Sequence, residues 1–234
     1  KRADLDDQLD EATAALDEAD ELARAASVAL RAPRDKEAAN QVVAAIAARR
    51  ALLESGSQLA ALSNSALQAL GSVNEAWSNL LAADDLARQA AALVTETTAE
   101  NVQASKDQTN KALDALDAAR ASLSNATDAF PSIDAAAIEA YLNKRAEALA
   151  SAIASDDAFL AKNKQEAAAQ NDAYNAADAE AAALAEKLPD DPSSLVLAAY
   201  DGESAALQQA YSTARSQAGT ADAFIHDYLG AEIK

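Results

Sequence analysis

Hydrophobic and polar positions alternate with the period of an α-helix along most of the chain. The first stretch is the clearest, because its apolar residues recur in alternating steps of four and three. They are Leu5, Leu9, Ala12, Leu16, Ala19, Ala23, Ala26 and Leu30. This spacing is the a/d seam of a heptad, along which one helix packs against another. Alternating runs of β-branched and polar residues between turns, which would indicate strands, are missing from the sequence. The pattern therefore predicts an all-α protein.

Proline, glycine and polar runs divide this pattern into segments, because proline cannot continue a helix and glycine weakens one. The expected helix breaks lie near Pro33, Gly56, residues 95–110, Pro131, Pro189–Pro192 and Gly219. The longest candidate helix begins after Ser132, which is placed to cap it, and runs to Leu188. Whether residues 35–96 form one bent helix or two stays open. We expect about five to seven helices in a single domain, residues 1–234.

Alanine changes the expected shape of the core. It accounts for 69 residues, whereas Leu, Ile, Val and Phe together occupy 43 positions, about 18 % of the chain. A composition so poor in large apolar residues borders on disorder, but alanine has the highest helix propensity and loses no side-chain entropy on folding. Small residues let helix axes approach closely along thin seams. We therefore expect an elongated, antiparallel helical bundle, a coiled-coil-like rod with alanine-rich seams.

The charge of the chain excludes several kinds of partner. The formal net charge is −19 and the isoelectric point is about 4.3. Binding to nucleic acid needs a basic stripe, which the sequence lacks, and anionic lipid is disfavoured for the same reason. No stretch approaches the ~20 apolar residues of a membrane span, so direct membrane insertion of this segment is not expected. An acidic surface of this kind suits a solvated domain or a cationic partner.

The sequence offers little for catalysis. It has no cysteine and one histidine, His226, so no zinc set and no Glu-x-x-His pair for iron can be assembled. The serines lie outside Gly-x-Ser-x-Gly turns, and the five glycines form no phosphate-binding loop. We therefore expect a protein that is not an enzyme, with no catalytic residue, no metal ligand and no cofactor.

Three arginines stand out as ligand-binding candidates, because they continue apolar stripes at helical spacing. They are Arg49, Arg88 and Arg145. A guanidinium group facing a seam could hold a small carboxylate ligand in a bidentate pair. The alternative is that each arginine packs its stem on the seam and pairs with a local acid, as Arg88 could with Asp84. The same spacing of four relates Asp20 to Arg24 and predicts a second surface pair.

The leading prediction is a structural or protein-interaction domain that binds a protein partner or itself. The chain starts at Lys1 and contains no methionine, so we expect a processed or excised part of a longer protein, located outside the cytoplasm (secreted, periplasmic or at the cell surface). The alternative is a helical sensor or carrier of a small anionic ligand around Arg145, Arg49 or Arg88. A coiled-coil oligomer is a third hypothesis, suggested by the first heptad seam.

Overall fold

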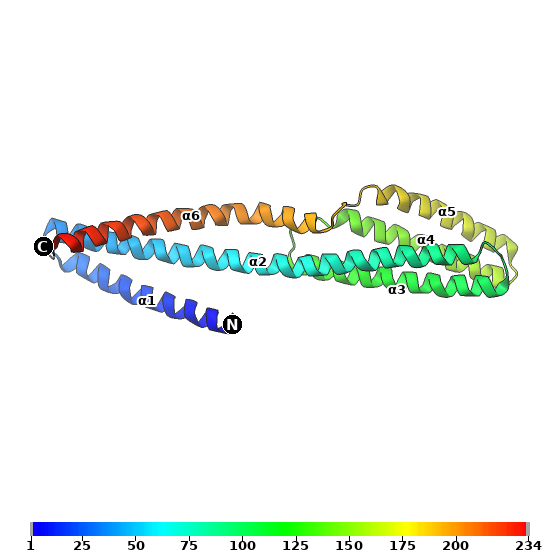
Figure 1. The fold of residues 1–234 in the computed structure, drawn as a ribbon, viewed down its shortest axis with the longest axis horizontal. Coiled ribbons are helices and arrows are strands. Elements are labelled where there is room, and N and C mark those ends of the chain that lie inside the picture. Colours follow the sequence, from blue (N-terminus) through cyan, green and yellow to red (C-terminus); the bar gives the residue numbers. More distant parts are fainter. Residues whose placement is uncertain (1, 233–234) are drawn as a thin grey trace. The chain divides into compact units, whose positions relative to one another are not determined.

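Helices fill nearly all of the chain. The computed structural model describes the backbone of residues 2–232 and the side chains of residues 8–228. In this range there are six α-helices and no strand, so the all-α prediction is confirmed (Figure 1). The helices are α1 (Arg2–Ala29), α2 (Pro33–Leu93), α3 (Ala99–Ala129), α4 (Ala136–Leu160), α5 (Lys164–Ala185) and α6 (Ser193–Glu232).

The chain divides into two units, where the sequence predicted a single domain. One unit, called here the terminal unit, comprises Lys1–Ser63 and Asp201–Lys234. The other, called here the central unit, comprises Asn64–Tyr200. Helices α2 and α6 each contribute residues to both units.

Neither glycine break occurs. Gly56 lies inside α2 and Gly219 inside α6, so both predictions of a break were wrong, and residues 35–93 belong to one helix. Glycine lowers helix stability by only ~1 kcal/mol relative to alanine, which the packing of a long helix outweighs. Gly56 also has a packing reason, because a Cβ at this position would lie 3.4 Å from the ring of Tyr211.

The long helix expected over residues 132–188 is two helices, α4 and α5, so that prediction was also wrong. Between them Lys162 adopts a left-handed backbone conformation with φ of 61°. The side chain of Asn163 then caps α5 by accepting a hydrogen bond from the amide of Glu166 at 3.2 Å. Ser132 does not cap α4, which begins at Ala136, whose amide donates to Asp134 Oδ1.

The proline and polar breaks are confirmed. Pro33 is the first residue of α2, a position where proline's fixed φ suits a helix start. Pro131 follows α3, and Pro189–Pro192 lie between α5 and α6. The polar run from residue 95 is a turn only at its beginning, because Thr98 caps α3 through its hydroxyl and the helix continues from Ala99.

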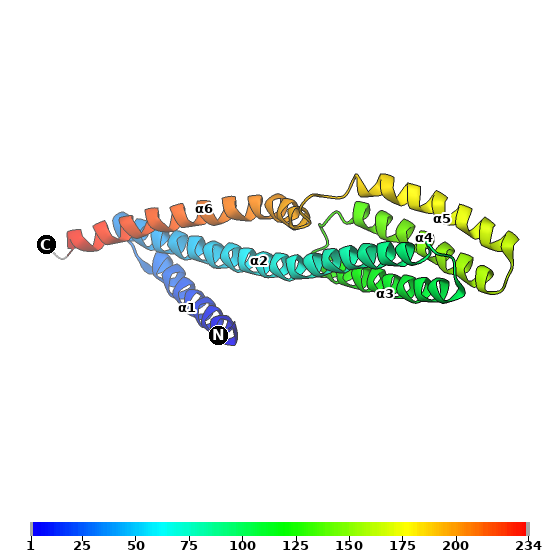
Figure 2. The same ribbon diagram turned by 45° about the vertical axis from the view of Figure 1, so that its right-hand side comes forward.

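The core of the central unit is thin and rich in alanine. Helix α4 packs against both α3 and α5, and lies beside α5 in both views (Figure 1, Figure 2). The largest fully buried apolar side chains of this unit are Val73, Leu80, Leu116, Leu123, Ile138 and Leu142. Between them lie fully buried alanines such as Ala69, Ala83, Ala112, Ala119 and Ala148. Alanine therefore makes up much of this core, as the composition predicted.

The terminal unit contains α1, the first half of α2 and most of α6. A series with strict heptad spacing runs along α6, and all its members except Tyr211 are buried or half-buried: Ser204, Leu207, Tyr211, Ala214, Ala218, Ala221, Ile225 and Tyr228. The hydroxyl of Tyr228 donates to Asp35 on α2 at 2.8 Å. On α1 the predicted seam is partly confirmed, since Ala23 is buried and Leu9 and Leu16 are half-buried, whereas Ala26 is exposed. The side chain of Leu5 lies outside the described side chains.

Candidate functional site

Arg145 is the most buried of the three candidate arginines. It lies in the middle of α4 in the central unit, and its side chain is 12 % exposed. Its Nε donates to Asp84 Oδ1 of α2 at 2.9 Å, and its Nη1 donates to Asp178 Oδ1 of α5. One guanidinium group therefore connects three helices through two carboxylates. We call Asp84, Tyr141, Arg145 and Asp178 the Arg145 cluster.

Tyr141 completes the cluster one helical turn before Arg145. Its hydroxyl donates to Asp84 Oδ2 at 2.6 Å, so both oxygens of Asp84 accept a hydrogen bond from α4. Burial, together with the hydrogen bond to Asp84, raises the pKa of Tyr141 and keeps the phenol protonated. Burial opposes the charge on Arg145, but the attraction of the Asp84 and Asp178 carboxylates outweighs it and raises the pKa of Arg145.

The cluster lies beside a surface groove of about 580 Å³, which Leu81, Arg88 and Ala182 also line. A small carboxylate reaching this groove would meet a guanidinium that already has two anionic partners. Displacing Asp84 or Asp178 would leave a partly buried carboxylate without its cation, which is unfavourable. The arrangement therefore favours connection of helices over capture of an anion by Arg145.

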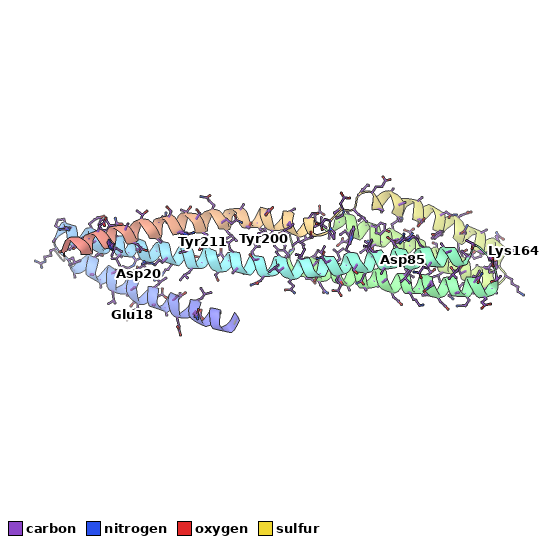
Figure 3. All side chains as sticks on the ribbon, viewed as in Figure 1. Glu18, Asp20, Asp85, Lys164, Tyr200 and Tyr211 are labelled. Atoms are coloured by element: carbon purple, nitrogen blue, oxygen red, sulfur yellow. The ribbon has the colours of Figure 1, made fainter. Side chains whose placement is uncertain are left out.

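Arg88 lies on the same groove but is exposed. Its side chain is 74 % accessible and its Nη2 donates to Asp85 at 3.2 Å. Figure 3 labels Asp85 on α2. Arg88 thus pairs with the neighbouring acid at a spacing of three, because Asp84, the acid expected from the sequence, is engaged by Tyr141 and Arg145.

Arg49 lies in the terminal unit, on α2, so the structure does not gather the three candidates in one unit. Its Nη2 donates to Asp222 Oδ1 of α6, and its side chain is 43 % exposed. This ion pair joins residues 173 positions apart in the sequence, which helical spacing could not reveal.

A second arginine cluster was missed by the sequence analysis. Arg50 donates to Asp17 at 2.6 Å and to Asp20 at 3.2 Å, so it fastens α2 to α1. Asp20 also accepts from Arg24 at 2.9 Å, as its spacing of four predicted. These hydrogen bonds, that of Arg24 foremost, lower the pKa of Asp20. Figure 3 labels Asp20 on α1.

The described residues, 2–232, contain no group of three or more His, Cys, Asp or Glu placed to hold a metal ion. His226 is exposed on α6, with its Nδ1 3.6 Å from Asp227. Within the same range, no helix combines the length and the apolar character that crossing a bilayer requires. The sequence matches no protein-family model. Comparisons with curated proteins and with solved structures also gave no match.

Proposed function

We propose that this chain is a non-enzymatic helical-bundle domain with a structural or protein-binding role. The observation that carries the proposal is the exposure of α1. Among its described side chains only Ala23 is buried, and Leu22 and Val28 are 66 % and 83 % exposed. A helix that keeps large apolar side chains in solvent while contacting its own chain along one edge is typical of a surface that a second protein covers.

The groove between α1 and α2 supports the same proposal. It has a volume of about 610 Å³ and is lined by Leu9 and Leu53 together with Asp10, Asp17 and Glu54. Arg50 also lines this groove, but its guanidinium group already forms ion pairs with Asp17 and Asp20. Apolar side chains flanked by acidic residues such as Asp10 and Glu54 suit an amphipathic segment that carries basic residues.

Photo-crosslinking tests the proposal. Benzoylphenylalanine replaces Leu22 on α1 in one variant and Gln103, an exposed position of α3, in a matched control. We expect discrete crosslinked products from position 22, either with a partner from the source cells or with a second copy, and several-fold fewer from position 103. Equal labelling from both positions, or none from position 22, contradicts the proposal.

A second candidate function is the binding of a small anionic ligand. The observation that favours it is Arg88, which projects an exposed guanidinium onto the groove beside the Arg145 cluster. Titration with mono- and dicarboxylic acids tests it. Binding that weakens at least about tenfold in Arg88→Gln, and is unchanged in a control such as Lys111→Gln, would favour this function over the first.

A further inference from the structure

A cleft in the central unit presents a carboxylate and hydroxyl groups, in contrast to the positively charged candidate arginines. It has a volume of about 100 Å³ and is lined by residues of α2, α3, α4 and α5. The α2 side is apolar, with Ala87, Ala90 and Ala91. The polar residues that line the cleft are Ser105, Thr109, Ser155, Asp156, Asn171 and Tyr174. No lysine or arginine is among the lining residues, all of which belong to the described part of the chain.

The hydroxyl groups of the cleft direct their hydrogens to protein acceptors. Thr109 donates to the carbonyl of Ser105 at 2.9 Å, and Ser155 donates to the carbonyl of Ala167 at 3.0 Å. Ser105 donates to the carboxylate of Asp156. A hydroxyl has one hydrogen but two lone pairs, so these three oxygens retain only acceptor capacity.

Asp156 adds a negative charge, and no lysine or arginine among residues 8–228 forms an ion pair with it. The ammonium of Lys106, which acts on Asp156 electrostatically, lies 2.5 Å from the carboxylate of Asp157, the next residue along α4. Burial raises the pKa of Asp156, as expected for a carboxylate whose lost hydration is not fully replaced by a nearby cation or hydrogen-bond donors. The ring of Tyr174 adds an aromatic surface, to which cations are attracted.

From this geometry we propose that the cleft binds a small primary ammonium ion, with the charge on Asp156 and the N–H groups directed at the hydroxyl oxygens. A primary ammonium carries three donors, which suits a site that offers a carboxylate and several acceptors. The volume excludes drug-sized ligands, whose pockets are ~300–1,000 Å³, and admits ions of a few heavy atoms. The site is independent of the proposed protein-binding surface of α1.

The test measures melting temperature with ammonium, methylammonium and ethylammonium chlorides at constant ionic strength, with sodium and tetramethylammonium as comparisons. Constant ionic strength matters because any cation screens a chain of charge −19. We expect a saturable rise with the primary ions and none beyond the sodium baseline with tetramethylammonium, which has no N–H donor. A rise of equal size with every cation overturns the proposal.

Two variants and a matched control locate the site. Asp156→Asn removes the charge, and we expect apparent affinity for ethylammonium to fall about tenfold or more. Ala152→Leu fills the cleft while retaining Asp156, and we expect the same loss. The control is Asp114→Asn, which removes an equal charge from an exposed position of α3 and leaves affinity within about twofold. Loss of binding in Asp114→Asn as large as in Asp156→Asn, or full binding in Ala152→Leu, overturns the proposal.

Discussion

Arg145 on α4 and Asp84 on α2 form an ion pair, with Nε 2.9 Å from Oδ1, that joins two helices of the central unit. The other carboxylate oxygen of Asp84 accepts from Tyr141, and the other side of the guanidinium binds Asp178. Because the Arg145 side chain is only 12 % exposed, its contribution to stability depends on all members of the Arg145 cluster being present.

Loss of the guanidinium should therefore destabilise the fold. Arg145→Met leaves Asp84 and Asp178 without their cation, and we expect the free energy of unfolding to fall by ~2–4 kcal/mol. Chemical denaturation of the variant measures this. Arg88→Met, at an exposed pair, should change stability by less than ~0.5 kcal/mol. Adding Asp84→Asn and Asp178→Asn to Arg145→Met should recover much of the loss, whereas a further decrease would contradict this account.

The helical glycines give a second prediction. Gly71 and Gly219 lie inside helices, and a Cβ at either position would have no neighbour within 4 Å. Each substitution by alanine should raise the free energy of unfolding by ~0.5–1 kcal/mol, because alanine is the better helix former. Gly56→Ala should gain less, because its Cβ would lie 3.4 Å from the Tyr211 ring. Thermal or chemical unfolding of the three variants gives the comparison, and an equal gain at all three positions would argue against the Tyr211 contact.

The thin core gives a third prediction. Leu116 and Leu142 are fully buried, so truncation to alanine removes contacts that the neighbouring alanines are too small to replace. We expect each change to lower the free energy of unfolding by ~2–5 kcal/mol. The matched control is Leu67→Ala, at a leucine that is 66 % exposed, with an expected change below ~0.5 kcal/mol. Similar losses at buried and exposed positions would show that the assignment of the core is wrong.

The pH dependence of the free energy of unfolding should reveal the raised pKa of Asp156. Its pKa is raised in the folded state, mainly by burial, with Asp157 adding to the effect and Ser105 and Lys106 opposing it. The folded state then binds this proton more tightly than the unfolded state, so the contribution of Asp156 to stability improves as pH falls through its raised pKa. No lysine, arginine or acid of α2 or α5 lines the cleft, and the titratable group that faces it from α5 is Tyr174.

Without added amine, Asp156→Asn should therefore be more stable than the parent at pH 7, and the difference should shrink as pH approaches 4. Melting curves of both proteins across this range measure the effect, with Asp114→Asn, at an exposed position of α3, as the control for removal of one charge. A difference that does not change with pH would contradict the assignment of the shift to Asp156.

The sequence predicted the elements that depend on local pattern. The heptad spacing of Leu9, Leu16 and Ala23 predicted the inner face of α1, and Pro33 and Pro131 marked real helix boundaries. The turn at Lys162 was missed because it contains neither glycine nor proline, and its left-handed residue is a lysine. Gly219 was overestimated as a break, because the helical seam continues through it on both sides.

Helical spacing in the sequence could not predict the acidic partners of Arg145 and Arg49, which lie on other helices. Arg145 meets acids 61 and 33 positions away, and Arg49 meets one 173 positions away, so only the packing of helices could identify them. The cleft around Asp156 was missed for the same reason, since its lining comes from four helices. Local pairs such as Asp20 with Arg24 were within reach, because both residues lie on one helix face.

The most direct test of this account compares acetate with ethylammonium at equal ionic strength and follows the melting temperature of the intact chain. If the inward-facing arginine is already paired and the open cleft accepts cations, ethylammonium raises the melting temperature and acetate does not. A saturable rise with acetate that disappears in Arg88→Gln, with no response to ethylammonium, would contradict the account and assign the chain to anion binding.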